Sequence, residues 1–134
     1  MSERYHFIII DDDRYNNIIC NAVLKKRPFA ATISLFESAD EGMSYIQQNY
    51  SEKQDELKTV LLLDINMPLK NGWEFMNDFE MLDATIREQF RVFMLSSSID
   101  ENDFSRASQN PNVQNYIVKP LTVEKISNLF SDLL

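Results

Sequence analysis

The sequence predicts an α/β fold in which a parallel sheet of five strands carries helices on both faces. Five short apolar runs recur along the 134-residue chain, and each is followed by a longer segment with helical periodicity. The runs are continuous rather than alternating, which is typical of strands that are covered on both faces. They comprise residues 7–10, 33–36, 60–63, 92–95 and 116–118.

Five helices are expected after these strands, with patterns at about 15–23, 39–50, 75–82, 99–107 and 123–133. The first should end before Pro28, and its periodicity places Cys20 on the polar side. The polar stretch 51–59 is expected to form a loop or a helix extension. The apolar residues of the first helix share one face at helical spacing: Tyr15, Ile18, Ile19, Ala22 and Val23.

The composition predicts one soluble domain over residues 1–134, with 44% hydrophobic and 25% charged residues. A formal net charge of −8 repels phosphate backbones and argues against direct nucleic-acid binding. No apolar stretch is long enough to span a membrane. A single cysteine, Cys20, has no partner for an internal disulfide, which favours a reducing compartment such as the cytoplasm.

Polar side chains follow four of the apolar runs directly. Asp11 and Asp12 follow the first run, Asp64 the third, Ser96 the fourth and Lys119 the fifth. Because the carboxyl ends of parallel strands share one edge of a sheet, these side chains are expected to meet there.

Such a cluster of carboxylates favours a bound cation. Two unit charges ~5 Å apart at an effective dielectric constant of ~20 repel by roughly 3 kcal/mol. Mg²⁺ prefers hard oxygen ligands and keeps open positions that phosphate oxygens can fill. Lys119 and Ser96 could hold further phosphoryl oxygens, which leaves one carboxylate as a nucleophile.

Four motifs, in this order and spacing, resemble those of response-regulator receiver domains of two-component signalling. They are IIIDDD at 8–13, LLLDINMPLKNGWEF at 61–75, FMLSSS at 93–98 and YIVKP at 116–120. The resemblance covers essentially the whole chain. It implies the CheY-like, flavodoxin-like doubly wound fold, with strand order 2-1-3-4-5 and five helices.

The resemblance also implies a metal site and a phospho-acceptor. Asp64 matches the aspartate that takes the phosphoryl group. Asp12 matches the direct Mg²⁺ ligand, Asp11 the acidic neighbour that acts through water, and the backbone carbonyl of Asn66 a further ligand. Asn66 and Ser98 stand where the family tunes the lifetime of the phosphoaspartate.

Switching residues and partners are implied in the same way. Ser96 and Tyr116 match the hydroxyl and aromatic residues that move on activation. Lys119 matches the lysine that pairs with phosphoryl oxygens, and its bond to Pro120 is expected to be cis. The implied donor is a histidine kinase or histidine phosphotransfer protein, and the output is contact with a downstream protein. The implied chemistry is limited to self-phosphorylation and slow autodephosphorylation, so the chain is not expected to be a turnover enzyme.

Two alternatives remain open. A Mg²⁺-dependent phosphatase or phosphotransferase could use an aspartyl nucleophile near the first strand, since Asp11-x-Asp13 resembles such a motif. However, Arg14 and Tyr15 do not match the residues expected next, and Asp64 would have no role. An interaction module without phosphorylation is the second alternative, against which the complete set of acids, hydroxyl and lysine argues.

Overall fold

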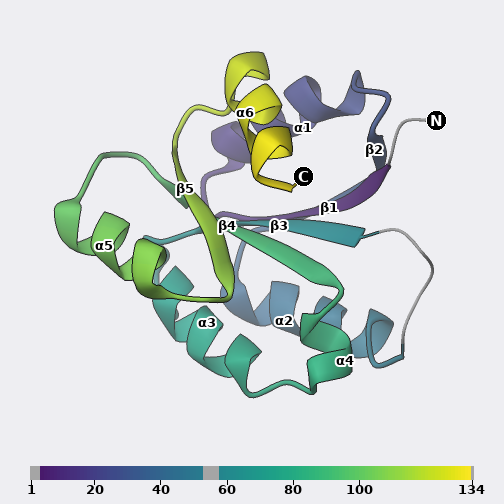
Figure 1. Cartoon of the computed structure of the whole chain (residues 1–134), viewed down its shortest axis with the longest axis vertical. Helices are drawn as coiled ribbons and strands as arrows, with labels where there is room; N and C mark the ends of the chain where they lie inside the picture. Colours follow the sequence, from purple (N-terminus) through teal and green to yellow (C-terminus); the bar gives the residue numbers. More distant parts are fainter. Residues whose placement is uncertain (1–3, 53–57, 134) are drawn as a thin grey trace.

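Five parallel strands form one sheet in the order β2-β1-β3-β4-β5, as predicted. The structure is a computed structural model that describes residues 4–52 and 58–133. The carboxyl ends of all five strands point to the same edge (Figure 1). The strands are β1 (Tyr5–Ile10), β2 (Ala30–Phe36), β3 (Lys58–Asp64), β4 (Phe90–Ser96) and β5 (Val113–Val118).

Helices cover both faces of this sheet, with α1 and α6 on one side and α2 and α3 on the other (Figure 1). Successive residues of β1 therefore alternate between two cores: Phe7 and Ile9 face α1 and α6, while Ile8 and Ile10 face α2 and α3. The helices are α1 (Arg14–Lys25), α2 (Ala39–Asn49), α3 (Gly72–Glu80), α4 (Ala84–Arg87), α5 (Glu101–Gln109) and α6 (Val123–Leu133). Within the described ranges, no helix is long and apolar enough to cross a membrane.

The described residues contain six helices, so the prediction of five was wrong. The additional helix, α4, is a single turn of four residues, held by the buried side chain of Ile86. A segment this short spans barely one helical period, so its sequence carries no amphipathic repeat to detect.

The strands also begin earlier than predicted, because their amino ends lie outside the continuous apolar runs and include polar residues. Lys58 and Thr59 belong to β3 rather than to the expected loop, and Thr59 is buried. Residues 53–57 of that expected loop lie outside the described residues.

The face of α1 that packs on the sheet is not the one its apolar residues suggest. Tyr15 and Ile18 are 80% and 63% exposed, whereas Cys20 is fully buried. The prediction that Cys20 lies on the polar side of α1 was therefore wrong. The helix is turned so that Asn16 and Asn17 point inward, where both donate hydrogen bonds to Asp11.

Gly72 begins α3 directly against the end of β3. Its N–H donates to the carbonyl oxygen of Ile65 over 2.9 Å. A Cβ at this position would lie 2.5 Å from the carbonyl oxygen of Asp64 and 3.0 Å from the Cα of Ile65. The absence of a side chain thus lets the helix start in contact with the strand.

We expect Gly72→Ala to lower the free energy of unfolding by roughly 1–3 kcal/mol or more, since backbone must move to admit the methyl group. Urea denaturation measures the change. Gly42→Ala in α2 is the comparison: its Cβ would overlap the buried side chain of Ile10, which can shift more readily than backbone, and alanine gains about 1 kcal/mol of helix propensity over glycine, so its loss should be smaller. Equal losses for both variants would contradict this account.

Candidate functional site

The carboxyl edge of the sheet brings together polar side chains from four segments. Asp11 directly follows β1, Asp64 ends β3, Ser96 ends β4 and Lys119 directly follows β5. The sheet register sets their relative heights: β1 and β3 run side by side up to the pair Ile10–Leu63, and the N–H of Lys119 donates to the carbonyl oxygen of Ser96 over 2.7 Å.

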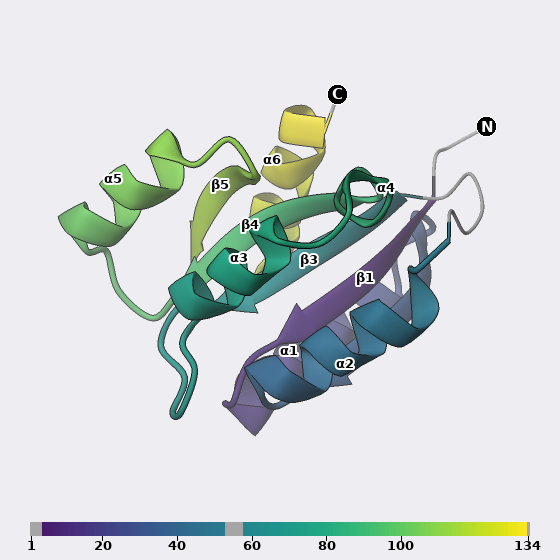
Figure 2. The ribbon, with the colours of Figure 1, turned by 90° about the horizontal axis from the view of Figure 1, so that it is seen from below.

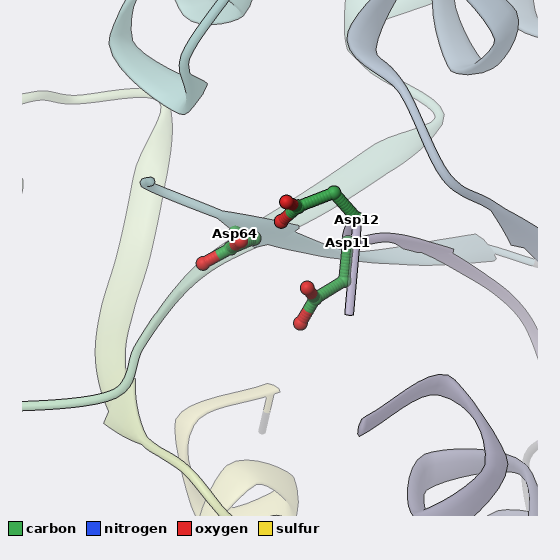
Figure 3. Close-up of side chains that lie close together, drawn as sticks. All are labelled: Asp11, Asp12 and Asp64. Atoms are coloured by element: carbon green, nitrogen blue, oxygen red, sulfur yellow. The ribbon is translucent and has the colours of Figure 1, made fainter. Parts of the chain in front are cut away.

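Three carboxylates meet at this edge. Asp11, Asp12 and Asp64 each offer an oxygen, and these oxygens lie within 4.8 Å of one another (Figure 3). Asp11 is fully buried, Asp64 is 3% exposed and Asp12 is open to solvent. The cluster is therefore closed at Asp11 and Asp64 and open to solvent at Asp12.

Lys119 bridges the two buried carboxylates. Its Nζ lies 2.7 Å from Oδ2 of Asp11 and 3.2 Å from Oδ1 of Asp64. Burial by itself lowers the pKa of Lys119, but hydrogen bonds and attraction to Asp11 and Asp64 outweigh it and raise the pKa. The lysine therefore stays cationic and pairs with both acids.

Hydrogen bonds hold both carboxylate oxygens of Asp11. Its Oδ1 accepts the N–H of Asp13 over 2.9 Å, and its Oδ2 accepts the side-chain amide of Asn16 over 2.7 Å. Asn17 donates its amide to the backbone carbonyl of Asp11 over 2.9 Å. Sequence reasoning missed Asn16 and Asn17, because the pattern of α1 predicts that its apolar residues, and not its asparagines, are buried.

The surroundings of Asp64 strongly alter the pKa of its carboxyl group. Burial, followed by the negative charge of Asp11, raises the pKa of Asp64 to about 7, against the pull of Lys119 in the opposite direction. One buried lysine thus does not fully compensate two buried carboxylates.

The residues present fit a divalent cation. Three carboxylates and the exposed Asn66, two residues beyond Asp64, supply hard oxygen donors of the kind that Mg²⁺ prefers. A cation among these oxygens would also relieve the repulsion that raises the pKa of Asp64.

Ser96 and Tyr116 share one hydrogen-bond acceptor. The buried Oγ of Ser96 and the phenol of Tyr116 both donate to the backbone carbonyl of Ser98, each over 2.7 Å. The ring of Tyr116 packs edge-on against Phe104 of α5, with centroids 5.9 Å apart. The two predicted switch residues are therefore connected through a single carbonyl.

Two further observations concern the backbone and the single cysteine. The Lys119–Pro120 bond is cis, as predicted. Cys20 is buried near Asp11. Burial, followed by the negative charge of Asp11, raises the pKa of the Cys20 thiol to about 12. Its Sγ accepts a hydrogen bond from Asn16 over 3.6 Å.

Comparison with known proteins agrees with this fold. A two-component response regulator from Cytophaga hutchinsonii matches over 98% of both chains, with 26% sequence identity and a TM-score of 0.88. A response regulator receiver protein from Dyadobacter fermentans matches over 95% of both chains, with 31% identity and a TM-score of 0.80. The fold is thus the flavodoxin-like fold of CheY-type proteins.

The sequence profile of the family described as "Response regulator receiver domain" matches residues 7–131. The chain belongs to this family. The transcriptional regulatory protein HptR of Staphylococcus aureus is 28% identical over 121 residues, which are 87% of this chain and 41% of that protein. The chain therefore spans about two fifths of the length of this curated relative.

We expect Asp64→Asn to stabilise the fold at pH 8 by on the order of 2–4 kcal/mol in the absence of divalent cations, and by less at pH 5. The folded-state pKa of about 7 lies above the ordinary 3.8, so wild-type stability falls as the pH rises between these values. Urea denaturation at both pH values measures the difference. Asp83→Asn is the control, because this carboxylate is exposed and makes no capping hydrogen bond at the start of α4. An effect of Asp64→Asn that did not change with pH would contradict the assignment.

Proposed function

We propose that this domain accepts a phosphoryl group on Asp64 from the phosphohistidine of a histidine kinase or histidine phosphotransfer protein. The observation that carries the proposal is the position of Asp64, an almost buried carboxylate between the Nζ of Lys119 and two further acids. An aspartate in a merely structural ion pair would not need two additional carboxylates beside it, since they destabilise its charged form.

In the proposed transfer, a carboxylate oxygen of Asp64 attacks phosphorus, and the bond from phosphorus to the imidazole nitrogen breaks. The leaving imidazole keeps the electron pair. Lys119 lies within reach of the same carboxylate and stabilises the negative charge on the phosphoryl oxygens. Nearly complete burial of Asp64 limits the access of water.

Mg²⁺ is the proposed cofactor, held by Asp11, Asp12, Asp64 and the backbone carbonyl of Asn66. When bound, it supplies positive charge that offsets the repulsion between the carboxylates and the incoming phosphoryl group. The bonds from Asn16 and Asp13 keep Asp11 oriented for this role.

We further propose that Ser96 and Tyr116 switch together. Phosphorylation adds about −1.5 to −2 charges at Asp64 and offers new acceptor oxygens. The hydroxyl of Ser96 then turns from the carbonyl of Ser98 toward the phosphoryl group. This change releases one of the two donors on that carbonyl, alters the restraint on Tyr116 and reaches α5 through Phe104.

The remaining features of the proposal follow from this role. The domain acts in the cytoplasm and signals by contact with a downstream protein, without binding nucleic acid or a membrane itself. Its only catalysis is its own phosphorylation and slow autodephosphorylation. Residues 1–134 form a single receiver domain, and Ser98 and Asn66, both exposed beside the site, set the lifetime of the phosphoaspartate.

Incubation with acetyl phosphate and Mg²⁺ is expected to add one phosphoryl group to the wild-type chain, because the site itself supplies much of the catalysis. Intact mass spectrometry measures the addition. Asp64→Asn should remain unlabelled, whereas Asp83→Asn, at an exposed site outside the cluster, should label like the wild type. Labelling of Asp64→Asn, or none of the wild type, would overturn the proposal.

Turnover of p-nitrophenyl phosphate distinguishes a phosphatase from the proposed phospho-accepting domain. Sustained turnover that is lost in Asp11→Asn but kept in Asp64→Asn would favour a phosphatase. We expect no sustained turnover from the wild-type chain.

The fluorescence of Trp73, the single tryptophan, is expected to report switching of α5. Its Nε1 donates to Asp103 over 3.0 Å, and the guanidinium of Arg106 lies 4.7 Å from the ring centroid, so a shift of α5 changes both contacts. Phosphorylation should change the emission of the wild type and change it much less in Ser96→Ala. Ser97→Ala, at the exposed neighbouring serine, is the control. An undiminished response in Ser96→Ala would argue against its switch role.

A further inference from the structure

A cavity lies between the second half of α2 and the amino-terminal parts of β1 and β2. Its volume is about 260 Å³. Figure 2 looks onto the face of the sheet that α2 covers and shows this helix running alongside β1. The acidic cluster follows the carboxyl ends of the strands, so the cavity is separate from it. The residues around the cavity include His6 and Ile8 of β1, Thr32 and Ser34 of β2, and Tyr45 and Asn49 of α2.

Polar side chains occupy positions that a covered parallel sheet usually fills with apolar ones. His6 pairs with Thr32 across β1 and β2, and Ile8 pairs with Ser34. Ile8 belongs to the core on the α2 side, so Ser34 faces α2, and so does the pair two residues earlier. The short hydroxyl side chains of β2 therefore leave space beneath α2 that larger apolar residues would fill.

Hydrogen bonds and ring contacts hold the walls of the cavity in place. Nδ1 of His6 lies 2.5 Å from Oγ1 of Thr32. Nδ2 of Asn49 donates to the backbone carbonyl of Tyr45 over 2.8 Å. The ring of Tyr45 packs against that of Phe36, with centroids 5.0 Å apart. A ligand would therefore meet walls that are already ordered, which lowers the entropic cost of binding.

The walls combine an aromatic ring and apolar surface with uncharged hydrogen-bonding groups. Tyr45 and Ile8 offer apolar contact. Among the residues that the structure describes, the hydroxyl of Ser34 has no hydrogen-bond partner, so it is available to a ligand. The described residues around the cavity include no aspartate, glutamate, lysine or arginine, which favours an uncharged ligand. An apolar cavity of roughly 150 Å³ holds benzene, so this larger one has room for a ring with a polar substituent.

We propose that this cavity binds a small, uncharged aromatic molecule that carries an amide or hydroxyl group. The ring packs against Tyr45, and the polar substituent bonds to the hydroxyl of Ser34. Small-molecule sites commonly combine apolar walls with a few placed polar groups in this way. The proposal does not rest on phosphorylation of Asp64, and it gives the domain a second ligand site at the opposite end of the sheet.

Nicotinamide is the probe, because it joins an aromatic ring to an uncharged amide. Titration of the isotope-labelled wild-type chain, followed by two-dimensional amide NMR spectra, measures binding residue by residue. Cyclohexanecarboxamide is the matched control ligand, since it keeps the amide and lacks the aromatic ring. Nicotinamide is expected to shift the amide signals of His6, Thr32, Ser34 and Asn49 saturably, with a dissociation constant on the order of 1 mM. Cyclohexanecarboxamide should bind at least about threefold more weakly, because it offers Tyr45 no aromatic face.

Two substitutions of Ser34 test the position of the ligand. Ser34→Leu fills the cavity and should weaken binding of nicotinamide by at least about tenfold, with a urea midpoint no lower than that of the wild type. Ser34→Ala removes only the hydroxyl and should weaken binding by about threefold or more. Leu35→Thr is the control variant, because Leu35 pairs with Ile9 on the opposite face of the sheet. It should bind like the wild type, and so should Asp64→Asn.

Three results would overturn the proposal. The first is the absence of saturable shifts in the signals of these four residues. The second is binding of cyclohexanecarboxamide as tight as that of nicotinamide. The third is undiminished binding to a folded Ser34→Leu variant. If Ser34→Leu does not fold, undiminished binding to Ser34→Ala overturns the proposal in its place.

Discussion

The site depends on one unfavourable arrangement, in which two carboxylates are buried side by side with a single lysine between them. Asp11 cannot relieve the repulsion by moving, because a backbone N–H, an asparagine amide and Lys119 all hold its oxygens. Burial and this repulsion together raise the pKa of Asp64 to about 7. An electrostatic imbalance of this kind favours the arrival of positive charge, and it gives the site a physical reason to bind a cation.

The parallel sheet makes this arrangement possible without any local sequence motif that contains all the participants. Asp11 and Lys119 are more than a hundred positions apart in the sequence, yet each follows the end of a strand in the same sheet. Gly72 contributes by allowing α3 to begin against the carbonyl of Asp64, so that this helix starts at the edge where the acids lie. The order of the strands and the start of α3 together determine the edge at which the acids lie.

The sequence predicted the carboxyl ends of the strands well, because an abrupt change from apolar to polar residues marks each of them. All five predicted runs end within one residue of the strands β1 to β5. The amino ends were harder, since Lys58 and Thr59 are polar and their place in β3 depends on pairing with β1 and β4. The single turn of α4 was too short to carry a repeat.

The orientation of α1 shows a deeper limit of sequence patterns. Periodicity identifies a face, but it assumes that the apolar face is the buried one. In α1 the buried face includes Asn16 and Asn17, because hydrogen bonds to Asp11 compensate the burial of their amide nitrogens. That compensation involves a residue outside the helix, so the pattern of α1 alone could not reveal it.

Cys20 belongs to this buried face, and its position has a practical consequence for spectroscopy. A thiol with a pKa of about 12 and no exposed surface stays protonated at neutral pH, and maleimide or iodoacetamide reagents react with the thiolate. A second cysteine engineered on the surface would therefore be the only position to take a fluorophore or spin label, with the native sulfur left in place.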